Sequence, residues 1–189
     1  MPSGEPGASR PYMPGYESMF HEQTLPWSWA RRVLEQARNY WFATNRLGAA
    51  PHVMPVWGVW LDNTVCFSTA VSSRKARNIM ADPRCTVTAE TAEGQVVLEG
   101  FATIDSTRVA RFVEAYSSKY DWPMEVGTDE PFFAVSPCRV FGFTEATVNP
   151  SQGATLWSFD DTAARLAALG GTDPSAQAGQ RRRSQPDPG

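Results

Sequence analysis

The sequence predicts a mainly β fold, a small antiparallel barrel with α-helices inserted at its rim. Short stretches rich in β-branched and aromatic residues follow one another along the chain, and several are joined by turns too short to hold a helix. Such a succession is typical of hairpins and small barrels. No G-x-G-x-x-G or G-x-x-x-x-G-K-[ST] motif is present to favour a doubly wound parallel sheet.

Composition narrows the function classes. The chain has 189 residues, of which 42% are hydrophobic and 12% aromatic, enough for one domain with a real core. A net charge of -3 argues against a general nucleic-acid-binding surface. Cys66, Cys85 and Cys138 are scattered in strand-like contexts, which predicts reduced core thiols. With only His21 and His52 as histidines and no CxxC motif, we expect no metal site.

The ends of the chain differ from its middle. Residues 1–23 are rich in Pro, Gly and Ser and predict an extended or disordered arm without the blocks of a signal peptide. Residues 24–160 are predicted to form the barrel domain. Residues 161–189 predict a short helix followed by a disordered, Arg-containing tail. No apolar stretch reaches transmembrane length, so we expect a cytoplasmic protein without a membrane partner.

The first half of the domain predicts one helix and three strands. Residues 26–38 carry apolar side chains at helical spacing, and Pro26 suits a helix start. Pro55 lies inside a β-rich run and lacks an N–H donor, so that strand should be bulged or unpaired on one side. The expected strands are 39–46, 51–61 and 64–70.

The second half predicts two more helices and five more strands. Ser72 or Ser73 can cap a helix over 73–81, which the Asp82-Pro83 pair ends. A second helix over 107–119 is expected after the capping residues 105–107. The expected strands are 84–90, 95–104, 132–137, 139–146 and 155–159.

The stretch "SSRKARN" at 72–78 places Arg74, Lys75 and Arg77 at a predicted helix start. Cations there oppose the helix dipole. They become favourable if an anion such as a phosphate binds the free N–H groups of the first turn. The alternative is a solvent-facing charged helix neutralised by acids elsewhere, such as Asp82 or Glu99. The segment alone leaves both interpretations open.

A hairpin, then "ST" at 68–69, "SRK" at 73–75, an Asp-Pro break and "QVVLEG" at 95–100 follow in this order. The order resembles the pyridoxamine 5'-phosphate oxidase-like, FMN-binding split-barrel superfamily. More narrowly, it is similar to the actinobacterial branch that includes reductases dependent on the deazaflavin coenzyme F-420. The resemblance covers about 29–159. It implies a six-stranded antiparallel split β-barrel that forms a homodimer with cofactors between the protomers.

The resemblance also implies site residues. The phosphate contacts would be Ser68, Thr69, Ser73, Arg74 and Lys75, with Arg77 as an extra partner for an extended anionic tail. The strand along the cofactor ring would carry Val53, Met54, Pro55, Val56 and Trp57. Gln95 would contact the ring, and Arg139 and Phe143 would be contributed across the dimer interface. His52, beside the ring strand, is interpreted as a polar rim residue, with proton donation as the alternative.

The chain departs from the family in two places. It lacks the C-terminal segment with Arg and His that grips a substrate phosphate, so vitamin B6 oxidase activity is not expected. The ring strand "VMPVWG" has no Arg or Lys, which favours F-420 over FMN. The resemblance therefore implies hydride transfer from F-420 to a small unsaturated or quinone-like acceptor, with no catalytic side chain identified. The alternatives are an FMN-dependent oxidase or reductase and a non-catalytic flavin, haem or lipid carrier.

Overall fold

The computed structural model describes residues 5–14, 23–46, 48–144 and 154–159. The three helices of this part are α1 (Trp27–Gln36), α2 (Arg74–Ala81) and α3 (Val109–Tyr120). The strands are β1 (Gly7–Ser9), β2 (Tyr40–Thr44), β3 (His52–Val56), β4 (Val59–Leu61), β5 (Thr64–Ser68), β6 (Arg84–Thr91), β7 (Gly94–Ile104), β8 (Phe132–Thr144) and β9 (Ala154–Ser158).

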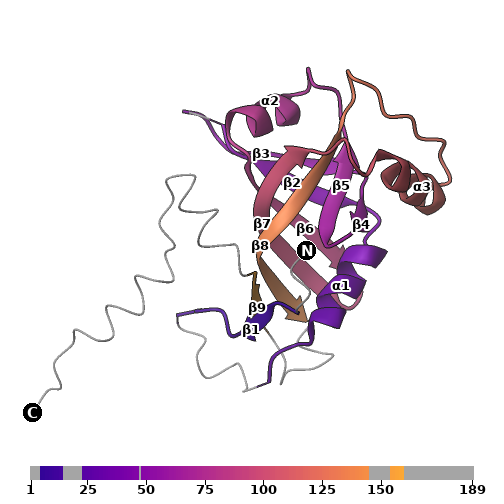
Figure 1. Ribbon diagram of the computed structural model, residues 1–189. Helices are drawn as coiled ribbons and strands as arrows, with labels where there is room; N and C mark the ends of the chain where they lie inside the picture. The colour runs from indigo at the N-terminus through magenta and orange to yellow at the C-terminus, as the bar shows by residue number, and fades with distance from the viewer. Residues whose placement is uncertain (1–4, 15–22, 47, 145–153, 160–189) are drawn as a thin grey trace, which may run out of the picture.

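The strands form one coiled antiparallel sheet, which confirms the mainly β split-barrel prediction (Figure 1). Its order is β1-β9-β8-β7-β6-β2-β3, and β5 pairs with both β8 and β4. The expected six strands are too few, because the described residues form nine. Within these residues no pairing joins β3 to β4, so the sheet stays open there. Part of the predicted arm is ordered as β1, whereas the predicted tail at 161–189 lies outside the described residues.

The stretch 51–61 forms two strands, so the prediction of one strand was wrong. Trp57 and Gly58 make a corner between β3 and β4. A Cβ atom on Gly58 would lie 2.7 Å from the carbonyl oxygen of Cys66, so only glycine lets the backbone pass this closely. β3 pairs with β2 alone. Pro55 therefore lies in an edge strand, as its missing N–H predicted.

The stretches predicted as strands at 132–137 and 139–146 are instead one long strand, β8. Pro137 does not interrupt β8, because the register of its pairing with β7 shifts opposite this proline, between Glu99 and Gly100. The first half of β8 pairs with β5 and its second half with β9. This strand therefore joins the two halves of the split barrel.

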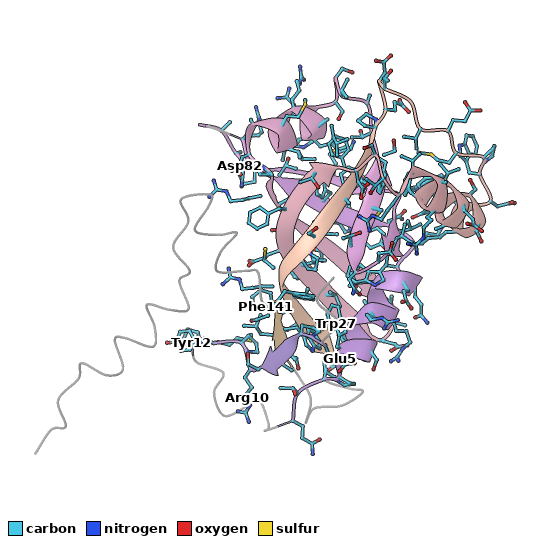
Figure 2. All side chains as sticks on the ribbon, viewed as in Figure 1. Glu5, Arg10, Tyr12, Trp27, Asp82 and Phe141 are labelled. Atoms are coloured by element: carbon cyan, nitrogen blue, oxygen red, sulfur yellow. The ribbon has the colours of Figure 1, made fainter. Side chains whose placement is uncertain are left out.

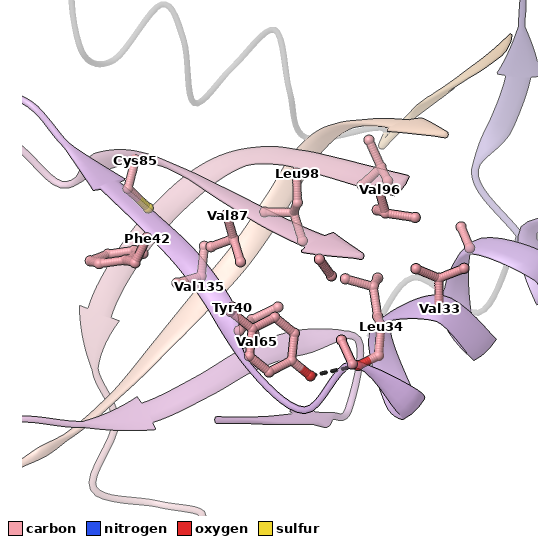
Figure 3. Close-up of a cluster of buried hydrophobic side chains, with 14 of the residues drawn as sticks. Val33, Leu34, Tyr40, Phe42, Val65, Cys85, Val87, Val96, Leu98 and Val135 are labelled. Atoms are coloured by element: carbon pink, nitrogen blue, oxygen red, sulfur yellow. Dashed lines mark hydrogen bonds between the residues drawn. The ribbon is translucent and has the colours of Figure 1, made fainter. Parts of the chain in front are cut away.

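The core lies between α1 and the inner face of the sheet. Figure 3 shows Val33 and Leu34 of α1 directed at this face, where the Tyr40 hydroxyl donates a 2.5 Å hydrogen bond to the Leu34 carbonyl. A second cluster forms where α3 places Phe112 and Tyr116 against β4, β5 and β8. All three cysteines are buried, as their strand contexts predicted.

The helices begin close to the predicted positions. Ser73 caps α2, and its Oγ accepts the N–H of Ala76 at 3.2 Å. α3 begins later than predicted because Asp105 holds a turn before it, accepting the N–H groups of Thr107 and Arg108 at 2.7 and 3.2 Å. In the part of the chain that the structure describes, no helix is long and apolar enough to cross a membrane.

Candidate functional site

Helix α2 lies against the loop end of the β2–β3 hairpin. Asn78 of α2 donates a 2.8 Å hydrogen bond to the Thr44 hydroxyl at the end of β2. Thr44 pairs with His52, the first residue of β3. The fold thus brings the predicted phosphate-binding helix and the predicted ring strand together.

Three cations lie close enough to His52 for their charges to act on its pKa: Arg46, Arg74 and Lys75, here called the cation cluster. Burial lowers the pKa of His52, and the charges of Arg74, Arg46 and Lys75 lower it further. Burial also lowers the pKa of Lys75. Among the described residues, no carboxylate lies within ion-pair distance of the cluster.

The two acids that could have neutralised α2 are engaged elsewhere. Asp82 pairs with Arg84 at 2.7 Å, and Glu99 pairs with Arg139 at 2.8 Å. The interpretation of "SSRKARN" as a helix neutralised by these acids is therefore not supported by the geometry. Arg77 is exposed on the same helix and makes no ion pair with a described residue. The charge at the helix start remains available to an anion.

The donors at this helix start differ in what they can offer. The N–H groups of Arg74 and Lys75 belong to the first turn and have no acceptor among the described residues. The Ser73 Oγ accepts from Thr69 Oγ1 and from Ala76 N, which leaves its own hydrogen to give. The Ser68 hydroxyl already donates toward the carbonyls at 130 and 131, and Thr69 donates to Ser73. Ser73 is therefore the hydroxyl best prepared to meet a phosphate.

The predicted ring strand presents an apolar surface. Val53, Met54 and Trp57 are 50%, 44% and 45% exposed, and Pro55 is exposed beside them. Val56 is buried opposite Tyr40, so its side chain belongs to the core. Val53 and Pro55 share the outer face of β3, where a flat ring could lie without meeting a charge.

Two of the remaining predicted contacts, Gln95 and Phe143, lie apart from the cation cluster. Gln95 and Phe143 pair with each other at the far end of β7 and β8. Gln95 is about 20 Å along β7 from Phe101, the partner of Arg84 near α2. In Figure 2, Asp82 lies beside α2 and Phe141, on β8, lies further along the sheet toward β9. One protomer does not bring these residues together with α2.

Arg139 lines a pocket of about 360 Å³ on the outer face of the sheet. Its guanidinium binds Glu99 there, with Nε 2.9 Å and Nη2 2.8 Å from the same carboxylate oxygen. Thr44 and Pro51, next to the cation cluster, line the same pocket. The pocket therefore extends from the β2–β3 hairpin across to β8.

Comparison with known proteins identifies the family. The family model described as pyridoxamine 5'-phosphate oxidase matches residues 29–141, more than half of the chain. The chain belongs to the pyridoxamine 5'-phosphate oxidase family. Its fold is that of the flavin-binding split barrels. No curated protein matches the chain significantly.

Solved structures with TM-scores above 0.5 share the fold of this oxidase-family chain at low sequence identity. A pyridoxamine 5'-phosphate oxidase-related, FMN-binding protein from Nostoc punctiforme has a TM-score of 0.54 and 19% identity, covering 74% of this chain and 93% of its own. A heme-binding protein from Mycobacterium smegmatis has a TM-score of 0.57 and 17% identity, covering 76% and 62%. A structure titled F-420 reductase has a TM-score of 0.48 and 20% identity, covering 58% and 94%.

Two groups at this oxidase-family site were not predicted. Arg46 completes the cation cluster, and its only sequence signal is its place just after a strand. A second group surrounds Gly58, where Lys119 and Tyr120 at the end of α3 contact the corner after β3. Lys119 and Tyr120 lie 61 and 62 positions from Gly58 along the chain, so local sequence patterns do not predict this contact.

Proposed function

We propose that this chain is an oxidoreductase that binds coenzyme F-420 and transfers hydride to a small unsaturated or quinone-like acceptor. The observation that carries the proposal is the cation cluster at the start of α2, which has no carboxylate partner among the described residues. Cations at the positive end of a helix are unfavourable unless an anion accompanies them. A phosphate group would supply that anion.

The residues present fit such a cofactor. Arg74 and Lys75 offer charge together with two free N–H groups, and Ser73 offers a hydroxyl hydrogen. Arg77, one turn further along, could meet an extended anionic tail. The adjoining β3 surface has no cation, which favours F-420 over FMN.

A second copy of the chain would complete the site. The outer face of the sheet exposes Trp41, Val53 and Pro55 side by side on β2 and β3. Gln95 and Phe143 lie at the end of the β7–β8 ladder that is far from α2 in the same protomer, and Arg139 lines the pocket on the outer face of the sheet. In a homodimer that buries this face, the partner could contribute these three side chains to the ring.

Reduced F-420, when bound, would supply the hydride, and the protein would bind and orient the reactants. Met54 and Trp57 would cover the ring strand and exclude water from it. We assign no side chain as a proton donor. His52 has a lowered pKa and is therefore neutral at neutral pH, so it could accept a hydrogen bond near the phosphate.

FMN is the second candidate cofactor, because the same helix start would bind its phosphate. A non-catalytic carrier of flavin, haem or lipid is the remaining alternative. Parallel fluorescence titrations of the purified protein with F-420 and FMN separate the first two. We expect tight F-420 binding and weak FMN binding, followed by reoxidation of reduced F-420 when quinone acceptors are added. Tighter FMN binding would overturn the cofactor assignment, and a bound cofactor that no acceptor reoxidises would favour the carrier.

A further inference from the structure

The corner after β3 is held by the last turn of α3. The Tyr120 hydroxyl accepts the N–H of Gly58 at 2.8 Å and lies 2.8 Å and 2.7 Å from the carbonyl oxygens of Gly58 and Arg38, its two possible acceptors. Lys119 Nζ donates to the same Gly58 carbonyl at 2.9 Å. Both polar groups of one backbone residue are thus bound by two adjacent side chains.

This corner carries Trp57. Its indole stacks on the Tyr120 ring with centroids 4.8 Å apart and planes 3° from parallel. Almost half of the Trp57 side chain remains exposed. The orientation of its exposed face therefore depends on how Gly58 is held against α3.

Lys119 occupies an unusual environment for an ammonium group. Nζ lies 3.3 Å from the Tyr40 hydroxyl, 4.9 Å from the Tyr40 ring centroid and 5.5 Å from that of Tyr120. The Arg38 guanidinium lies over the Tyr120 ring, 5.6 Å from its centroid. No described carboxylate forms an ion pair with Lys119. The carbonyl, the ring faces and the C-terminal end of α3 are what stabilise its charge.

We propose that Lys119 is a positioning residue: its ammonium holds the Gly58 carbonyl and so fixes Trp57 against Tyr120, and loss of its proton loosens this corner. A charged donor binds a carbonyl more strongly than a neutral amine does. The consequence for ring binding rests on the proposed function, because Trp57 ends the proposed ring strand. The effect on Trp57 itself does not.

The pKa of Lys119 lies close to neutral pH. Burial, and then the charge of Arg38, lower the pKa of Lys119 to about 8. The neighbouring titratable groups change charge at higher pH. Burial raises the pKa of Tyr40 and of Tyr120 above the ordinary value of 10, and it raises that of Cys66 to about 11. Glu35 also faces this region and pairs with Arg31 at 3.5 Å. A transition near pH 8 at Trp57 would therefore report Lys119.

The test uses the full chain labelled with 5-fluorotryptophan and followed by 19F NMR from pH 6.5 to 9.5. The chain has seven tryptophans, and the Trp57 signal is the one that Trp57→Phe removes. We expect this signal to move with a midpoint near pH 8 in the wild type. It should stay at the low-pH position in Lys119→Arg and at the high-pH position in Lys119→Met.

A Trp57 signal that does not move in the wild type, or that moves equally in Lys119→Met, would overturn the proposal. Lys75→Met is the matched control, because Lys75 is the other lysine of the chain and should leave the Trp57 titration unchanged. A parallel F-420 titration separates the two proposals. A normal Trp57 transition without F-420 binding supports the role of Lys119 and contradicts the cofactor, whereas the reverse result contradicts the role of Lys119 alone.

Discussion

Burial and the neighbouring Arg74 guanidinium together hold the pKa of His52 below its ordinary value of 6.5. Since Arg46 and Lys75 add to this effect, the imidazole reports the electrostatic potential of the cation cluster. A phosphate bound to the cluster would cancel part of that positive potential. The protonated form of His52 would then become more favourable.

We predict that F-420 raises the pKa of His52, so that binding takes up a proton and tightens as the pH falls toward 6. 1H–13C NMR titration measures this directly. The chain has two histidines, and His52→Gln assigns the signal. A titration midpoint that is the same with and without F-420 would show that the phosphate does not lie near His52.

The inner face of β8 has no room for a side chain at Gly142. A Cβ atom there would lie 2.7 Å from ring atoms of both Trp157 and Trp29. We expect Gly142→Ala to lower the free energy of unfolding by about 1–3 kcal/mol, the usual cost of overpacking. Gly127→Ala is the control, since nothing lies within 4 Å of its added Cβ. Urea denaturation of both variants checks this, and equal stabilities would contradict the packing described for β8.

Asp105 should make stability depend on acid pH. Burial alone would raise its pKa, but hydrogen bonds from Thr107 and Arg108 outweigh it and lower the pKa to about 2. The carboxylate therefore stabilises the fold above about pH 4, and this contribution is lost as the pH falls through 4 toward 2.

We expect Asp105→Asn to cost about 1 kcal/mol at pH 7, because the amide loses the charged contact with Arg108. The difference from the wild type should shrink as the pH falls from 4 to 2. Chemical denaturation at several pH values measures both quantities. A difference that stays constant over this interval would mean that Asp105 is not ionised in the way its contacts indicate.

The sequence was most informative where local chemistry decides the structure. Ser73 caps its helix as predicted, and Pro55 lies in an edge strand because it has no N–H to give. The predicted strand boundaries were wrong at Gly58 and Pro137. Each depends on a close backbone approach from a neighbouring strand, at Cys66 and at Gly100, which the residue pattern of the strand itself does not reveal.

The same limit applies to the candidate site. The charges of Arg74 and Lys75 could be interpreted from their spacing alone. Spacing alone could not predict that no described carboxylate pairs with them, since this depends on Asp82 and Glu99 pairing with other arginines in the fold. Arg46 and Lys119 join the site through tertiary contacts from other elements. The family resemblance supplied the candidate residues, and the fold separated those near α2 from those a partner would have to contribute.

The most direct test is the affinity of the Arg74→Ala/Lys75→Ala double variant for F-420, measured by fluorescence titration. Arg31→Ala/Arg32→Ala is the matched control, because it removes the same charge from α1, where both cations pair with glutamates. Charged hydrogen bonds contribute about 1.5–3 kcal/mol each, so the dissociation constant should rise at least about 100-fold in the first variant. It should stay near the wild-type value in the control. Equal dissociation constants for the wild type and the Arg74→Ala/Lys75→Ala variant would contradict the assignment of α2 as the phosphate site.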